Sequence, residues 1–136
     1  MSTLRDYLEV WESASTRPHE VLKEFGMYDN FMDILASTVT PLLSPIYRGT
    51  CRHGDLRPGD LLEYTYPSSW TKDESIAFRF IEEDDTRVIL EYDGACIRGV
   101  FNKYNSYGES EIILYPITFK VIHVFNERDY TRVILE

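Results

Sequence analysis

The chain has 136 residues, 43% of them hydrophobic and 14% aromatic, so a single folded domain over residues 1–136 is expected without the help of disulfides or metals. Its formal net charge of −9 repels nucleic acids and anionic membranes. Because no run of adjacent Lys and Arg residues offsets that charge, neither is expected as a partner.

The sequence predicts neither a leader peptide nor a membrane span. Arg5, Asp6 and Glu9 interrupt the start of the chain, which therefore lacks the apolar core of a signal peptide. No apolar stretch approaches the roughly 20 residues that cross a bilayer. We expect a soluble cytoplasmic protein, acting in its own cell or in a host cell if delivered as an effector. Cys51 and Cys96 are expected to be buried free thiols, with no disulfide framework and no metal site.

Residues 1–44 are predicted to be helical. Apolar residues recur every three or four positions from 4 to 11, which predicts a helix with one buried face. A second helix is expected between Pro18, which suits a first turn, and Gly26, which ends it. A third is expected over residues 31–39. The apolar positions of the first helix are Leu4, Tyr7, Leu8 and Trp11.

Residues 45–136 are predicted to form a β-rich core of short strands separated by turn residues. The hexapeptide Thr-Arg-Val-Ile-Leu-Glu occurs at 86–91 and again at 131–136, and we interpret it as two core strands with similar packing demands. The whole pattern predicts one α+β domain, with helices first and a mostly antiparallel sheet after them. Strands are expected at 45–50, 61–66, 87–92, 99–101, 111–115, 119–125 and 131–136.

Three segments carry residues suited to chemistry, and the first is Tyr47-Arg48-Gly49 at the end of a predicted strand. The guanidinium of Arg48 is a planar fork of donors that matches a phosphate or a carboxylate. In isolation the same pattern is typical of a surface arginine.

The second segment, Ser68–Thr71, joins a predicted strand to a short helix. Residues 71–74 form a capping box that predicts the start of this helix and accounts for the hydroxyl of Thr71. Capping does not account for Ser69, which is a candidate to orient a neighbouring carboxylate. The buried face of the helix is expected to comprise Ile76, Ala77 and Phe80.

The third segment, Gly108–Glu111, comes directly before an apolar strand. Glu109 and Glu111 are two positions apart, so they are expected to project from one face of that strand. Two like charges this close tend to raise a carboxyl pKa, a cost that proteins seldom accept without a use. The alternative interpretation is a solvated strand end.

The order of these segments resembles the arginine-specific mono-ADP-ribosyltransferases, of the type named for its arginine, serine and glutamate. The resemblance extends over about residues 30–124. Tyr47-Arg48-Gly49 is similar to the family's first strand, Ser69-Trp70-Thr71 to its Ser-Thr-Ser motif, and Gly108–Glu111 to its Glu-x-Glu catalytic strand. The resemblance implies N-terminal helices followed by two small, mostly antiparallel sheets that form an NAD cleft.

The same resemblance implies an enzyme that cleaves NAD at the nicotinamide bond and transfers ADP-ribose to an accessible arginine of a target protein. Glu111 would stabilise the positive charge that develops on the ribose. Ser69 would hold Glu111 in position, and Glu109 would orient and deprotonate the incoming guanidinium. Arg48 would bind a phosphate of NAD, and the backbone of Gly49 would lie near the nicotinamide amide.

Three aromatic residues are implied in recognition. Phe80 matches the aromatic that packs on nicotinamide, with simple helix core as the alternative. Tyr104 and Tyr107 precede the glutamates, in the segment that corresponds to the family's target-recognition loop, where Tyr107 could stack on the substrate arginine.

Two departures from the family pattern are visible. Trp70 replaces a small hydroxyl residue, and Glu83 stands where the family often has a basic residue, so Arg79 or Arg87 would have to make the second phosphate contact. Two alternative functions stay open, an NAD glycohydrolase in which water takes the ADP-ribose, and a non-catalytic member that acts as a binding module. The sequence does not indicate an oligomeric state.

Overall fold

The computed structural model describes residues 3–14, 17–82, 85–105, 108 and 110–136. The helices are α1 (Leu4–Ser13), α2 (Pro18–Glu24), α3 (Tyr28–Ser37) and α4 (Glu74–Arg79). The strands are β1 (Val39–Pro41), β2 (Ile46–Thr50), β3 (Leu61–Tyr64), β4 (Ser68–Thr71), β5 (Val88–Tyr92), β6 (Cys96–Phe101), β7 (Glu111–Leu114), β8 (Ile117–Asn126) and β9 (Thr131–Leu135).

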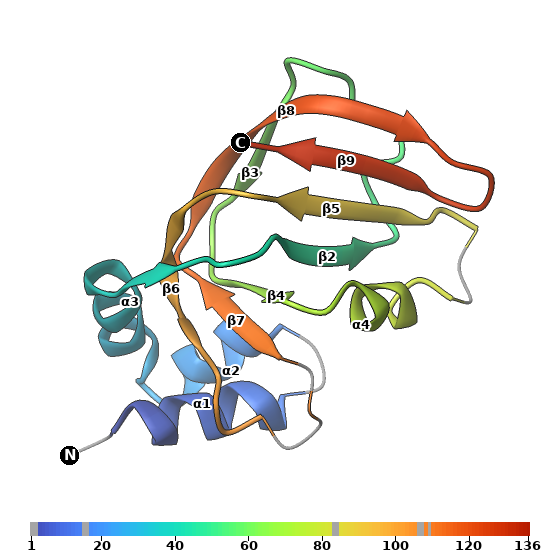
Figure 1. Ribbon diagram of the computed structural model, residues 1–136. Coiled ribbons are helices and arrows are strands. Elements are labelled where there is room, and N and C mark those ends of the chain that lie inside the picture. The colour runs from blue at the N-terminus through green and yellow to red at the C-terminus, as the bar shows by residue number, and fades with distance from the viewer. Residues whose placement is uncertain (1–2, 15–16, 83–84, 106–107, 109) are drawn as a thin grey trace.

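The strands form a curled sheet in the order β1-β6-β7-β4-β2-β5-β9-β8-β3 (Figure 1). β5 and β9 are parallel, and the other neighbouring pairs among the described strands are antiparallel. This arrangement confirms the predicted α+β fold. The resemblance implies two small sheets. In the structure β2 pairs with β4 at Tyr47 and Thr71, so the strands on either side of this pairing belong to one continuous sheet.

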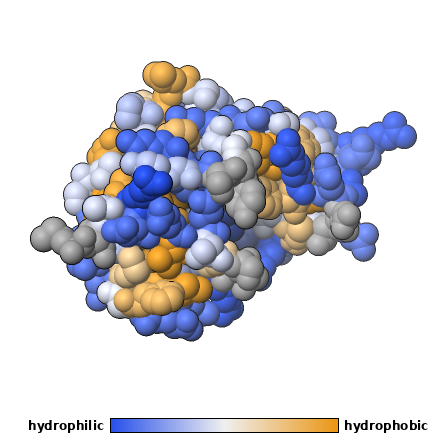
Figure 2. Space-filling model, turned by 90° about the horizontal axis from the view of Figure 1, so that it is seen from below, coloured by the Kyte–Doolittle hydropathy of each residue, from blue (hydrophilic) through white to orange (hydrophobic). Residues whose placement is uncertain are grey.

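Helices α1 and α2 lie beneath the β6–β7 end of the sheet, α3 lies beside β6, and α4 lies beside β2 and β4 (Figure 1). The surface seen from below is mostly hydrophilic, with hydrophobic residues interspersed (Figure 2). Tyr7, Leu8 and Trp11 of α1 are buried in one apolar cluster with Phe31 of α3 and Ile113 of β7. The predicted stripe of α1 is therefore a packed face. Its packing also fixes the last turn of α1 close to the start of β7.

The short helix begins later than the capping box predicted. Thr71 belongs to β4, where it pairs with Tyr47 on one side and Glu111 on the other. The helix starts at Glu74, and its N-cap is Asp73, whose side chain accepts a hydrogen bond from the Ser75 backbone at 3.0 Å. Sheet pairing on both sides of Thr71 outweighs local capping, and Asp is as good an N-cap residue as Thr.

Three smaller expectations are also wrong. The third helix ends at Ser37, and Val39 instead begins β1, because β-branched residues favour an edge strand that pairs with β6. Phe80 lies just beyond α4 and is 62% exposed, so it does not belong to the buried face of that helix. Cys96 is exposed and Cys51 only partly buried, and the two do not form a disulfide.

Candidate active site

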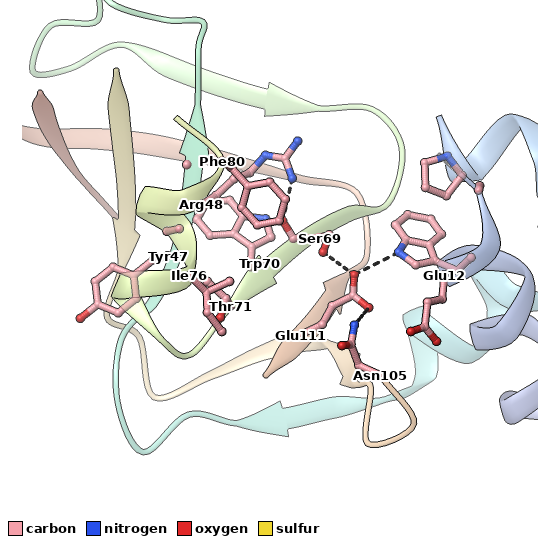
Figure 3. Close-up of a pocket in the computed structure, with 15 residues that line it drawn as sticks. Glu12, Tyr47, Arg48, Ser69, Trp70, Thr71, Ile76, Phe80, Asn105 and Glu111 are labelled. Atoms are coloured by element: carbon pink, nitrogen blue, oxygen red, sulfur yellow. Dashed lines mark hydrogen bonds between the residues drawn. The ribbon is translucent and has the colours of Figure 1, made fainter. Parts of the chain in front are cut away.

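A cavity of about 340 Å³ lies between the last turn of α1 and helix α4, with β2, β4 and the start of β7 behind it (Figure 3). Its size is within the range of about 300–1,000 Å³ typical of small-molecule sites. The lining residues are Trp11, Glu12, Ala14, Pro18, Tyr47, Arg48, Gly49, Ser69, Trp70, Thr71, Ile76, Ala77, Phe80, Asn105 and Glu111.

Glu111, the first residue of β7, faces this cavity and is 9% exposed. Its Oε2 accepts hydrogen bonds from Ser69 Oγ at 2.5 Å and from Trp11 Nε1 at 3.3 Å. Its Oε1 accepts from Asn102 Nδ2 at 2.8 Å and from Asn105 Nδ2 at 3.4 Å. Donors from three separate segments of the chain therefore hold the carboxylate in one orientation (Figure 3).

Ser69 reaches Glu111 because β4 and β7 are adjacent antiparallel strands, with Thr71 opposite Glu111 and Ser69 opposite Ile113. Side chains alternate along a strand, so Ser69 lies on the same side of β4 as Thr71. Trp70 points the other way and is buried in the apolar core of the sheet. The Ser-Trp-Thr sequence thus leaves Ser69 free to face the carboxylate.

Arg48, on β2, donates a hydrogen bond from Nη1 to the backbone oxygen of Ser69 at 2.6 Å. Its guanidinium carbon lies 5.6 Å from the centre of the Tyr64 ring. Burial raises the pKa of Tyr64, and the nearby Arg48 charge opposes that shift. Ser69 is therefore bonded to Arg48 through its carbonyl and to Glu111 through its hydroxyl, and the three predicted residues converge on one cavity.

Helix α4 approaches β2 so closely that a glycine is needed between them. A Cβ atom at Gly49 would lie 2.0 Å from the backbone oxygen of Ala77. This contact explains the glycine without any ligand, and it also places Phe80, just after α4, in the cavity wall. The cavity brings together Arg48, Gly49, Ser69, Phe80 and Glu111.

None of the other predicted site residues that the structure describes lines this cavity. Arg87 donates from Nη2 to the backbone oxygen of Glu82 at 2.6 Å and is not among the lining residues; nor is Arg79. Tyr104 lies outside the lining as well, with the guanidinium carbon of Arg5 at 5.0 Å from its ring centre. Glu83, Tyr107 and Glu109 lie outside the described residues.

Sequence reasoning missed several residues that contact Glu111 or line the cavity. Apolar periodicity predicts core packing alone for Trp11, although a buried indole N–H needs a hydrogen-bond partner, and that need is the signal. Asn102 and Asn105 precede Glu111 by nine and six positions, and nothing in their spacing distinguishes them from ordinary turn residues. Glu12 lines the cavity beside Trp11.

A second cavity, of about 440 Å³, is larger but chemically poorer, because no carboxylate is present among its described lining residues. In the part of the chain that the structure describes, no three His, Cys, Asp or Glu side chains gather closely enough to hold a metal ion. None of the described helices combines the length and apolar character needed to cross a membrane. The second cavity is lined by Val39, Tyr92, Cys96, Ile97, Arg98, Tyr115, Pro116 and Ile117.

A comparison with protein-family models finds no match, and a comparison with curated proteins finds none. Solved structures do match. The chain resembles Vis, an ADP-ribosyltransferase toxin from Vibrio splendidus, with a TM-score of 0.62 and 17% identity, over 96% of this chain and 66% of Vis.

It also resembles exoenzyme S from Pseudomonas aeruginosa, with a TM-score of 0.57 and 17% identity over 97% of this chain and 66% of that one. The catalytic domain of VahC from Aeromonas hydrophila gives a TM-score of 0.53 and 15% identity over 100% of this chain and 86% of that one. The chain thus spans about two thirds of the length of Vis and of exoenzyme S. It has the ADP-ribosyltransferase fold.

Proposed function

We propose that this protein is a mono-ADP-ribosyltransferase that cleaves NAD at the nicotinamide glycosidic bond and transfers ADP-ribose to an arginine of a target protein. The observation that carries the proposal is the hydrogen-bonded chain from Arg48 through Ser69 to Glu111, in one cavity of an ADP-ribosyltransferase fold. A fold by itself does not define a reaction, so the proposal depends on this arrangement of side chains.

The lining of the cavity suits the nicotinamide half of NAD and its pyrophosphate. A guanidinium at Arg48 matches a phosphate, and the exposed ring of Phe80 offers a flat apolar surface to a flat heterocycle. Exoenzyme S, which shares the fold, was solved bound to carba-NAD. Arg48, Phe80 and Glu111 are the residues that would hold the substrate.

Glu111 would act on the charge that develops during the reaction. The glycosidic C–N bond breaks, its electron pair leaves with nicotinamide, and the ribose carbon becomes electron-poor, as in glycoside cleavage. A carboxylate already fixed by Ser69, Trp11 and Asn102 stabilises that positive charge without reorganising. The new bond then forms from the ribose carbon to a guanidino nitrogen, which loses a proton to a base.

A substrate hydroxyl can donate a hydrogen bond to the Glu111 carboxylate only if one of its present donors moves away. A carboxylate offers about four acceptor positions, and four donors already point at this one. The longest of these bonds is the one from Asn105, at 3.4 Å, and Asn105 lines the cavity. A ribose hydroxyl would therefore replace the Asn105 amide at Oε1.

Arginine is the proposed acceptor because Glu109 stands two positions before Glu111, where the resemblance places the residue that deprotonates it. A base is needed since the guanidinium pKa lies above about 12. Vis, which shares the fold, was solved in complex with agmatine, a small guanidine. The acceptor assay therefore uses NAD and agmatine, and chromatography separates nicotinamide, ADP-ribosyl-agmatine and free ADP-ribose.

Glu109→Gln should keep NAD cleavage but lower the ratio of ADP-ribosyl-agmatine to free ADP-ribose at least tenfold. The amide cannot take the proton that the guanidinium must lose, and general base catalysis contributes on the order of 10²–10⁴ in rate. Equal loss of both products in this variant would assign Glu109 another role. Free ADP-ribose as the main product of the wild-type protein would instead make it an NAD glycohydrolase, and absence of nicotinamide release would make it a binding module.

Trp11→Phe should lower kcat for NAD cleavage about tenfold and lower the melting temperature by several degrees without loss of the folded state. The ring can still pack on Phe31, but the donor to Glu111 is lost, and a hydrogen bond to a charged group contributes about 1.5–3 kcal/mol. Tyr7→Phe is the matched control, because Tyr7 lies in the same helix and apolar cluster without lining the cavity. A wild-type kcat in Trp11→Phe would limit Trp11 to packing.

A further inference from the structure

The cavity has opposite electrical character at its two sides. Of its described lining residues, Arg48 is the one that carries a positive charge, and it lies toward α4 and Phe80. The carboxylates among the lining residues that the structure describes are Glu111 and Glu12, and Glu12 comes from α1 on the other side (Figure 3). A dinucleotide phosphate suits the first side, which leaves the second side for a group of positive charge.

Glu12 lies at the C-terminal end of a helix, which is itself electrically negative. It belongs to the last turn of α1, which ends at Ser13 and has no basic residue in that turn. The C-terminal end of a helix carries a partial negative charge of about half an elementary charge, which adds to the charge of the Glu12 carboxylate. A cation bound at this point would interact favourably with both the carboxylate and the helix end.

The residue before Glu12 ties this end of α1 to Glu111. The preceding residue, Trp11, is buried against Phe31 and donates its indole N–H to Glu111. In Figure 3 the Glu12 side chain extends from α1 toward the Asn105 side of the cavity. Glu12 is partly exposed, so an incoming group can reach its carboxylate from solvent.

We propose that Glu12, with the C-terminal end of α1, binds the guanidinium of the acceptor and so selects a cationic guanidine over water. A planar guanidinium matches a carboxylate through two parallel hydrogen bonds, and the local negative potential raises the concentration of cations at the cavity mouth. This inference rests on the proposed transfer to arginine. Glu12 is a binding residue for the acceptor, distinct from Glu109, which takes the proton.

The test measures acceptor binding separately from catalysis. Agmatine is titrated calorimetrically into the wild-type protein with carba-NAD present, and into Glu12→Gln and Glu12→Lys. Loss of the paired hydrogen bonds between the Glu12 carboxylate and the guanidinium should weaken agmatine binding about tenfold, or about 1.4 kcal/mol, and Glu12→Lys should abolish it. Glu9→Gln is the matched control, because Glu9 lies on the same helix, pairs with Arg5 at 3.0 Å and does not line the cavity.

The same variants are assayed with NAD and agmatine. In Glu12→Gln the Michaelis constant for agmatine should rise about tenfold and the ratio of transfer to hydrolysis should fall, while Glu9→Gln keeps the wild-type ratio. Agmatine binding and partitioning equal in Glu12→Gln and Glu9→Gln would overturn the assignment of Glu12. A wild-type protein that binds agmatine through Glu12 but does not cleave NAD would contradict the proposed function and leave the acceptor site standing.

Discussion

Glu111→Gln is expected to lower the rate of nicotinamide release by about 10²–10³-fold, the cost of removing one preorganised electrostatic contact to a developing charge. Glutamine has nearly the same shape and can still accept from Ser69, so the strand and the cavity should persist. What it lacks is the negative charge that stabilises the ribose in the transition state more than in the ground state.

The same substitution has a predicted structural cost. One carboxylate oxygen becomes an NH₂ group, which must face either Ser69 and Trp11 or Asn102 and Asn105. Either the indole N–H of Trp11 or the amides of Asn102 and Asn105 then lose their acceptor. A buried donor left without an acceptor costs about 1–3 kcal/mol, so the melting temperature should fall without loss of the folded state.

Circular dichroism, melting temperature and nicotinamide release distinguish these effects. Glu63→Gln is the control, because Glu63 is an exposed residue of β3 outside the cavity. If Glu111→Gln released nicotinamide at the wild-type rate, Glu111 would have no part in the chemistry.

Arg48→Ala should raise the Michaelis constant for NAD by about tenfold to hundredfold, because hydrogen bonds to a charged group contribute about 1.5–3 kcal/mol. Arg48 also donates to the backbone oxygen of Ser69, so kcat should fall as Ser69 is held less firmly. Arg48→Lys should recover little of the lost affinity for NAD, since an ammonium cannot reproduce the planar fork of a guanidinium.

Steady-state kinetics together with calorimetric titration of carba-NAD separate the two roles of Arg48. Arg128→Ala controls for the loss of one surface charge, because Arg128 is exposed in the turn between β8 and β9. Carba-NAD binding of unchanged affinity in Arg48→Ala would place the phosphates elsewhere.

The sequence predicted most of the fold because its signals are local. Helical periodicity marks α1, and turn residues separate the strands. The two copies of the repeated hexapeptide lie in β5 and β9, which are neighbouring strands. Val88 is opposite Thr131, so the two copies are displaced by two positions. A shift of two keeps the same side chains on the same face, and Val88 and Val133 are both fully buried.

The errors arise where tertiary contacts outweigh local preference. Thr71 has the sequence context of a helix cap but pairs with two strands, and Phe80 has helical spacing but follows the end of α4 at a cavity. The hydrogen bond from Trp11 to Glu111 joins residues 100 positions apart, and apolar periodicity could not reveal it. The order of Arg48, Ser69 and Glu111 was predictable, whereas the donors that complete the site were not.

A crystal structure of the protein with carba-NAD tests the central claim most directly, namely that Arg48, Ser69 and Glu111 surround a single dinucleotide. We expect a hydroxyl of the nicotinamide ribose within about 2.6–3.2 Å of a Glu111 carboxylate oxygen, with the Asn105 amide displaced, and a phosphate beside the Arg48 guanidinium. A dinucleotide bound in the cavity beside Cys96, or bound with its ribose away from Glu111, would contradict the account.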